Sequence, residues 1–293
     1  MKKVGLVTVL YNSPEVLSDF FSSIAIQNYK EYCLYIVDNS TNPESLNVAK
    51  KMCQELNIFA KFIDNEGNNV GVAAGNNQGA RLAYQDGCDY ILFLNNDLIF
   101  NDPNVVTYMM QHAAENQFEM ISPLILSYPL KKIWYVGGYF NEWKAIAPHN
   151  EIDCEFDSNS YNKITQHAYA PTCFLMITKA VWESVGEMDE RYFAYYDDTD
   201  FLYRAYKKGY IVNVIPDAII YHKVGASTGG DISYFGMYHL TRNRLMFIRK
   251  NLSGIKKTIS LCYVLTSRAC VFVKSKNKKA IFKGIVDGLS YKL

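Results

Sequence analysis

The segment of residues 90–97 constrains the fold of this chain more than any other part of the sequence. Residues 91–94 are four consecutive apolar side chains, which is typical of a strand buried on both faces inside a parallel sheet. This strand ends directly in Asn95, Asn96 and Asp97. Open α/β sheets bind ligands beyond the carboxyl ends of their strands, so these residues point to a site, although a polar turn explains them equally well.

Strands and helices alternate through the first part of the chain. The apolar patterns predict strands at residues 4–10, 34–37 and 58–63, with helices at 14–24 and 43–56 between them. This β-α-β-α-β order predicts a parallel sheet with right-handed crossovers. The first two strands also end in polar residues, at Tyr11-Asn12 and at Asp38.

Small residues and asparagines alternate from residue 69 to residue 79, just before a helical stretch. Glycines allow a backbone to approach a ligand closely, and the start of a helix attracts phosphate. The spacing fits neither a Rossmann fingerprint nor a Walker loop. Close packing of the helix against the sheet is the alternative explanation.

A second acidic segment contains Asp197, Asp198 and Asp200 in the first turn of a predicted helix. Acidic residues favour helix N-termini by ~0.3–1 kcal/mol each, which explains them without any chemistry. Adjacent carboxylates repel each other, however, so a cation or a proton taken from a substrate would also account for them. The short strands predicted at 211–215 and 218–221 end at His222. A lone histidine is usually structural, but this one follows a strand end as Asp97 does, so the two could share a metal.

The charge is unevenly distributed along the chain. Residues 249–293 carry eleven Lys and Arg but only one acid, Asp287, which leaves 19 basic and 28 acidic residues before them. An amphipathic helix predicted at 238–249, an apolar stretch at 258–273 and a lysine cluster at 274–279 favour contact with an anionic membrane surface. Packing onto the body or a homodimer face explains them equally well. We expect no nucleic-acid partner, because the body is acidic and no such motif occurs.

The seven cysteines are scattered and form no Cys-x-x-Cys pair, so the sequence signals neither a zinc site nor a disulfide framework. No stretch reaches the ~18 uninterrupted apolar residues of a spanning helix, and no signal-peptide cleavage pattern follows the start. We therefore expect a cytoplasmic protein, peripheral on the inner face of the cell membrane if the tail binds lipid. The expected domains are residues 1–230 and a basic helical extension at 231–293.

In order, these motifs resemble those of the large family-2 glycosyltransferases with the GT-A fold, especially rhamnosyl- and galactofuranosyl-type transferases of bacterial surface polysaccharide synthesis. The resemblance covers residues 4–227. Each motif is weak alone, whereas six in the right order are a strong signal. The motifs are Thr8-x-x-Tyr11-Asn12, Val37-Asp38-Asn39-Ser40, the segment from Asn69 to Gly79, Leu94-Asn95-Asn96-Asp97, Phe193-x-Tyr195-x-Asp197-Asp198-x-Asp200, and His222 with Ser227.

The resemblance implies an α/β fold with a mostly parallel sheet flanked by helices, and inverting transfer of a sugar. The donor would be a nucleoside-diphosphate sugar, UDP- or dTDP-linked, and the acceptor a hydroxyl of a glycan or lipid-linked glycan. Asp198 would be the catalytic base. Asp97, with His222 as a further ligand, would bind Mg²⁺ or Mn²⁺ at the donor diphosphate. The implied nucleotide-sugar-binding residues are Thr8, Tyr11, Asn12, Asp38, Asn69, Gly71, Gly75, Asn77, Asn95 and Asn96.

The chemistry supports these roles independently. Release of a nucleoside diphosphate builds negative charge, which a divalent cation with oxygen ligands neutralises. The attacking hydroxyl loses a proton, which a carboxylate within ~2.6–3.2 Å can take. Two positions depart from the family pattern. Asn95 replaces the first acid of Asp-x-Asp, which weakens the expected metal site, and Asp197 replaces a glutamate, so the base is Asp198 by register or Asp197.

Two other functions remain open. A nucleotidyltransferase would be expected to have a basic, glycine-rich loop after the first strand, which residues 11–14 are not. The second alternative is a catalytically silent protein that binds a sugar nucleotide. The presence of Asp97, Asp198 and His222 argues against it. The sugar, the base and the acceptor would depend largely on the irregular region from residue 128 to residue 169.

Overall fold

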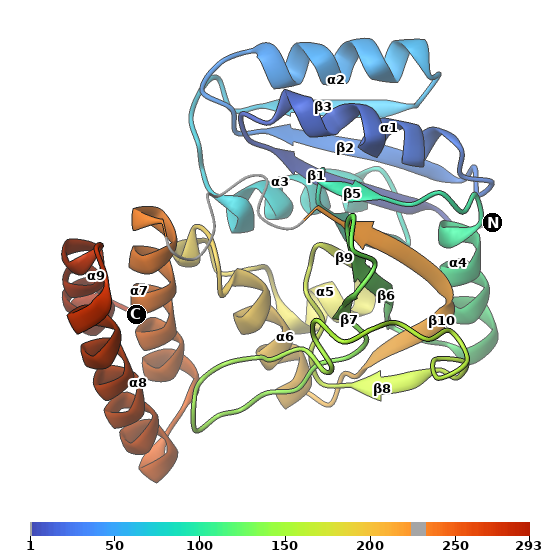
Figure 1. Cartoon of the computed structure of the whole chain (residues 1–293). Helices are drawn as coiled ribbons and strands as arrows, with labels where there is room; N and C mark the ends of the chain where they lie inside the picture. Colours follow the sequence, from blue (N-terminus) through green and yellow to red (C-terminus); the bar gives the residue numbers. More distant parts are fainter. Residues whose placement is uncertain (1, 224–232) are drawn as a thin grey trace.

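The computed structural model describes residues 2–223 and 233–293 and contains one large mixed sheet with helices around it (Figure 1). Ser227 and the predicted boundary between residues 230 and 231 lie outside the described residues. Among the described residues the strand order is β3-β2-β1-β4-β9-β6-β10-β5, with β7 paired to β6 and β8 paired to β10. The strands are β1 (Val4–Leu10), β2 (Tyr32–Asp38), β3 (Ala60–Asp64), β4 (Tyr90–Leu94), β5 (Leu98–Ile99), β6 (Met120–Ser127), β7 (Ile133–Tyr135), β8 (Thr165–His167), β9 (Phe174–Thr178) and β10 (Val212–His222).

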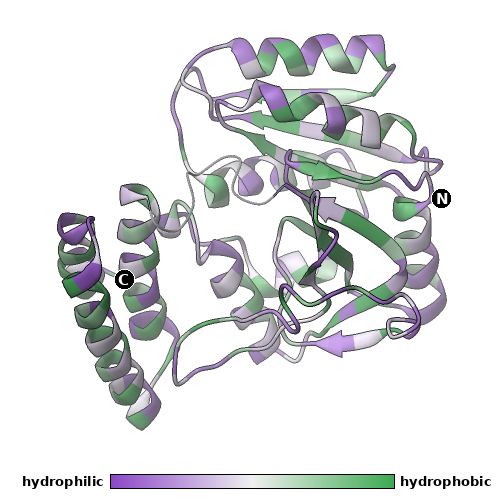
Figure 2. Cartoon of the chain, in the orientation of Figure 1, coloured by the Kyte–Doolittle hydropathy of each residue, from purple (hydrophilic) through white to green (hydrophobic). Residues whose placement is uncertain are grey.

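Strands β1 to β4 form the parallel part of the sheet, as the alternating pattern predicts. Strands β1, β2 and β4 are almost entirely buried, whereas the edge strand β3 is half-buried, and Figure 2 shows much of the central sheet in green. Nearly continuous apolar strands of this kind need cover on both faces. The cover comes from helices whose bounds are α1 (Leu17–Ala25), α2 (Glu44–Glu55), α3 (Val72–Gln85), α4 (Val105–Asn116), α5 (Lys179–Val185) and α6 (Asp197–Lys207), with short 3₁₀ turns at Pro14–Val16 and Glu190–Tyr192.

Helix α3 packs closely on β1 because two of its residues have no side chain. A Cβ added at Gly79 would lie 2.4 Å from Cγ1 of Val7, and one added at Gly75 would lie 2.8 Å from Cγ2 of Val9. No real Cβ approaches a neighbour so closely, so the glycines set the distance between helix and strand. For these two residues, close packing accounts for the glycine-rich segment.

The second half of the sheet is mixed. Strand β9 runs antiparallel to both β4 and β6, and β10 runs parallel to β6. The two strands predicted at 211–215 and 218–221 are one strand, β10, whose register shifts between Ile215 and Ile219. Pro216 lies in this shift because it has no N–H to donate to the ladder.

Three helices follow the sheet: α7 (Tyr234–Asn251), α8 (Gly254–Lys274) and α9 (Lys278–Ser290), which lie together at one end of the molecule (Figure 1). Helix α7 is longer than predicted and its apolar residues 245–248 are buried. Helix α9 packs on α7 through Gly284 and Gly288, where an added Cβ would lie 2.8 Å from a carbonyl oxygen of α7. The sequence pattern did not separate α9 from the lysine cluster. Among the described helices, none combines the length and apolar character that crossing a bilayer requires.

Candidate active site

A cavity of about 820 Å³ opens at the carboxyl ends of β1, β4 and β10. Eight of the thirteen predicted site residues line it, although they come from segments up to two hundred residues apart in the sequence. These eight are Tyr11, Asn69, Gly71, Asn95, Asn96, Asp97, Asp198 and His222.

Asp97 and His222 lie side by side in this cavity. The short strand β5 pairs antiparallel with the end of β10, so that His222 faces Leu98 in the register. The backbone N–H of Lys223 donates to the carbonyl of Asp97 at 3.0 Å. As a result, Nε2 of His222 is 3.2 Å from Oδ1 of Asp97, and both side chains are buried.

This pair fits a divalent cation. Oδ1 of Asp97 and Nδ1 of His222 are buried and accept or donate no hydrogen bond within the described part of the chain. Unpaired buried polar atoms are rare and indicate a missing partner. No group of three or more His, Cys, Asp or Glu side chains gathers for a metal among the described residues. The described residues therefore offer two candidate ligands, one carboxylate and one imidazole, and Asn95 stands where the family pattern has a second carboxylate.

Asp198 lies in the same cavity and is held by its neighbours. Its Oδ2 accepts a hydrogen bond of 2.6 Å from the hydroxyl of Tyr169. Its Oδ1 accepts from the backbone N–H of Thr199 at 2.5 Å and from the Thr199 hydroxyl at 3.1 Å. These hydrogen bonds fix the carboxylate of Asp198 in one orientation at the cavity wall.

Asp197, in contrast, is almost fully buried. Its burial, together with the neighbouring carboxylate of Asp198, raises the pKa of Asp197 to about 7. Both acids line the cavity, but their environments differ: Asp198 is half-buried and hydrogen-bonded to Tyr169 and Thr199, whereas Asp197 is almost fully buried. Different environments of this kind separate the roles of paired carboxylates.

The remaining five predicted site residues do not line the cavity. Asn12 joins the turn after β1 to the turn after β2, since its side chain exchanges hydrogen bonds with Thr41. Asp38, just below that turn, accepts from the backbone N–H of Ser40. Thr8 is fully buried in β1. Gly75 packs against Val9, as described above, and Asn77 is bonded in both directions to the backbone of Met188.

A protein-family model described as "Glycosyl transferase family 2" matches residues 6–185, which is more than half of the chain. The chain belongs to glycosyl transferase family 2. The family resemblance found in the motifs is thereby confirmed. The family model ends before Asp198, so the part of the cavity wall formed by residues 193–199, 222, 235 and 240 lies beyond the matched residues.

Two curated relatives from the same family resemble the chain. The chain is 28% identical over 207 residues to the low-salt glycan biosynthesis hexosyltransferase Agl10 of Haloferax volcanii, covering 69% of this chain and 61% of that protein. It is 23% identical over 284 residues to the dTDP-rhamnosyl transferase RfbF of Shigella flexneri, covering 84% and 90%.

Solved structures share the fold. The mannosyltransferase PcManGT of Pyrobaculum calidifontis, in complex with GDP-Man and Mn²⁺, matches 99% of this chain and 76% of its own with a TM-score of 0.59 and 12% identity. Residues 1–349 of Staphylococcus aureus TarS, in complex with UDP, match 94% of this chain and 76% of their own with a TM-score of 0.59 and 16% identity. The predicted GT-A fold, with its mostly parallel sheet, is confirmed.

The family motifs did not reveal the aromatic wall of the cavity. Trp134 packs edge-on against His222, with ring centroids 4.4 Å apart, and against His149 at 4.7 Å. Burial lowers the pKa of His149, whose Nδ1 lies 2.7 Å from the carbonyl oxygen of Trp134. Trp134, His149 and Tyr169 come from the irregular region of residues 128–169. The aromatic content of this region was the only sign of the aromatic wall in the sequence.

The burial of Asp197 has a measurable effect on stability. An acid whose pKa is raised in the folded state holds its proton there more tightly than in the unfolded chain. The free energy of unfolding therefore falls as the pH rises from the ordinary value of 3.8 to about 7. Between pH 5 and pH 8 we expect this fall to be about 2 kcal/mol larger in the natural protein than in Asp197→Asn. Urea denaturation of both proteins across this range measures the difference, and parallel pH profiles would contradict it.

Proposed function

We propose that the protein is an inverting glycosyltransferase that moves a sugar from a nucleoside-diphosphate donor to a hydroxyl of a glycan or lipid-linked glycan. The observation that carries the proposal is the single cavity that contains both Asp198 and the pair of Asp97 and His222. The first offers a base for the acceptor hydroxyl, and the second offers ligands for a cation at the diphosphate.

In this proposal the residues named below each have a defined role. Asp198, oriented by Tyr169, accepts the proton of the attacking hydroxyl. Asp97 and His222 would hold Mg²⁺ or Mn²⁺, which would supply positive charge to neutralise the leaving diphosphate. Asn69, Gly71 and Tyr11 line the same cavity and would contact the nucleotide sugar. Attack opposite the leaving group inverts the anomeric centre.

The donor is proposed to be UDP- or dTDP-linked. One relative is named a dTDP-rhamnosyl transferase, and a structure with the same fold is in complex with UDP. The structure in complex with GDP-Man also contains Mn²⁺, in line with a divalent cation here. Nucleotidyl transfer is less well supported, because no Lys or Arg among the described residues lines the cavity to hold a triphosphate.

The variant Asp198→Asn tests the proposed base. We expect turnover to fall at least about 10²-fold, since general base catalysis contributes about that much, while donor affinity stays nearly constant. Release of nucleoside diphosphate measures turnover, and calorimetry measures affinity. If Asp198→Asn turned over normally and Asp197→Asn did not, Asp197 would be the base. If neither change affected turnover, neither carboxylate would be the catalytic base, and the proposed reaction would have no base at this site.

We further propose that the protein works at the cytoplasmic face of a membrane and that α9 contacts anionic lipid. The outward face of α9 exposes Phe282, Val286 and Leu289, and Phe282 is 63% exposed. Five lysines lie on or next to the helix, and Figure 2 shows the alternation of apolar and polar bands along it. The lone acid Asp287 accepts from the hydroxyl of Tyr238 on α7. An apolar stripe flanked by lysines is typical of a helix that lies in the interface of an anionic bilayer.

Vesicle flotation tests this contact. The natural protein should float with vesicles that contain phosphatidylglycerol but not with phosphatidylcholine alone. Phe282→Ser should lower the bound fraction about tenfold, because burial of a phenylalanine contributes roughly 1.5–3 kcal/mol. The matched control is Phe59→Ser, since Phe59 is equally exposed at 65% but precedes β3. No flotation of the natural protein, with a concentration-dependent dimer in solution instead, would assign the face to a second copy.

A further inference from the structure

The segment that leads into Asp197 and Asp198 is strained. Phe193, Tyr195 and Tyr196 have φ angles of 64°, 61° and 67°, in the left-handed region that bulky residues seldom adopt. Each such residue costs about 1–3 kcal/mol, and the conformation persists only where surrounding structure holds it. This segment forms part of the cavity wall, so whatever holds it also determines where Asp198 lies.

One side of the segment is held by helix α3. The backbone N–H of Val72 donates to the carbonyl of Phe193 at 2.7 Å. Gly71 has a φ of +89°, and a Cβ there would lie 2.7 Å from the same carbonyl oxygen. The glycine therefore permits the contact between the start of α3 and the strained segment.

The other side is held by helix α7. The side chain of Asn243 is fully buried, and its Nδ2 lies 2.9, 2.7 and 2.8 Å from the carbonyl oxygens of Tyr192, Ala194 and Tyr195. A primary amide has two N–H donors and serves these three acceptors at once. Only a hydrogen-bond donor fits at this position, because an oxygen atom there would face three carbonyl oxygens. The amide thus compensates for the carbonyls that the left-handed turns direct inward.

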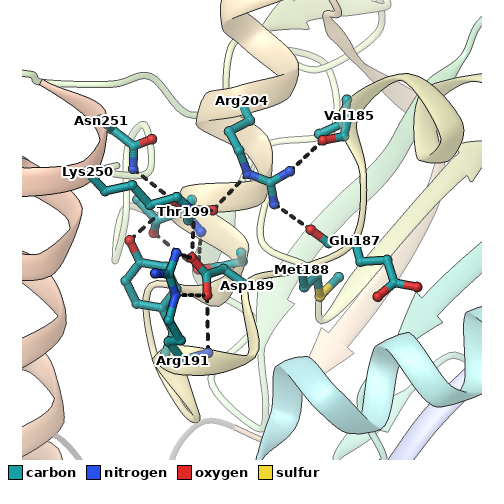
Figure 3. A network of polar contacts seen from close by, with 12 residues as sticks. Val185, Glu187, Met188, Asp189, Arg191, Thr199, Arg204, Lys250 and Asn251 are labelled. Carbon is teal, nitrogen blue, oxygen red and sulfur yellow. Dashed lines mark hydrogen bonds and ion pairs between the residues drawn. The ribbon is translucent and has the colours of Figure 1, made fainter. Parts of the chain in front are cut away.

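Helix α7 is itself anchored to the acidic segment by charges at its C-terminal end (Figure 3). Nζ of Lys250 lies 2.8 Å from Asp200 and 2.6 Å from Asp189, and Asn251 donates to Asp200 at 2.8 Å. Burial alone would raise the pKa of Asp189, but hydrogen bonds from Arg191 and Lys250 hold that pKa well below its usual range. Asp200 is fully buried, and removing one partner of a buried pair leaves an uncompensated charge.

We propose that Asn243 is a positioning residue for sugar transfer: from α7 it fixes the strained segment and thereby sets the position of Asp198 in the cavity. This inference rests on the proposed role of Asp198. Asn243 does not itself line the cavity, its hydrogen bonds go to backbone carbonyls and not to Asp198, and it lies beyond the residues that the family model matches. The C-terminal helices, on this account, include a part of the catalytic machinery.

The experiment uses Asn243→Ala and Asn243→Asp in the full-length protein, with Arg249→Ala as the matched control. Arg249 is also on α7 and also donates to backbone carbonyls, but to those of Gly288 and Tyr291 beyond the cavity. The first readout is hydrogen exchange of the peptide covering residues 192–199, compared with β1. The second is the rate of nucleoside diphosphate release, and the third is the affinity for the nucleotide.

We expect both Asn243 variants to exchange faster in residues 192–199 and to lose about 10²-fold in turnover, since misplacement of a reacting group by about 1 Å costs that much. Nucleotide affinity should change less than about threefold, because the donor side of the cavity is formed by other elements. Arg249→Ala should resemble the natural protein in all three readouts. If Asn243→Asp does not fold, Asn243→Ser, which keeps one donor, replaces it and should give an intermediate effect.

If hydrogen exchange in residues 192–199 were no faster in the Asn243 variants than in the natural protein, the inference would be overturned, whichever reaction the protein catalyses. Faster exchange with normal turnover would overturn it as well, because the segment would then move without consequence. If Asp198→Asn itself kept its turnover, the proposed base would fail, while the exchange data would still decide whether Asn243 holds the segment.

Discussion

The candidate site depends on one short piece of strand pairing. Only two residues form β5, yet their antiparallel pairing with the end of β10 places His222 beside Asp97. Asp97 and His222 have 124 residues between them in the sequence, and the strands β5 and β10 reach the same edge of the sheet from different parts of the fold. Six other predicted site residues line the cavity at this edge, because the carboxyl ends of β1 and β4 open onto it as well. Without the pairing, the carboxylate would be a buried charge with no partner.

Two kinds of carboxylate share the cavity. Asp97 is a buried acid that has a histidine next to it and no hydrogen-bond donor among the described residues, which suits a cation ligand. Asp198 accepts three hydrogen bonds, one from the Tyr169 hydroxyl and two from the N–H and hydroxyl of Thr199, which hold its carboxylate in one orientation. Asp197 is the residue that the fold keeps partly protonated at neutral pH. A single acidic motif thus contains carboxyl groups in different environments, because Asp198 is half-buried and hydrogen-bonded whereas Asp197 is almost fully buried.

Much of the fold could be predicted from the sequence, because parallel strands buried on both faces leave long apolar runs with polar residues at their ends. The prediction that Asp97 and His222 meet followed from the same reasoning. Asn77 shows where this reasoning stops. It sits in a motif that suggests ligand binding, but its side chain is bonded to Met188, and no local pattern distinguishes the two roles. Tyr169 and Asn243 could not be predicted, since their importance comes from single contacts made across 29 and about 50 positions.

The proposed role of Asp97 and His222 is to hold a divalent cation at the donor diphosphate. Calorimetric titration of the natural protein, Asp97→Ala and His222→Ala with UDP and dTDP, with Mn²⁺ and then with EDTA, tests it most directly. We expect nucleotide affinity to fall at least about tenfold when either the metal or one ligand is removed, in line with the usual effect of disturbing a metal site. Because both changes act on one site, EDTA should have little further effect on the variants. Nucleotide affinity that is indifferent to EDTA and equal in all three proteins would contradict the claim.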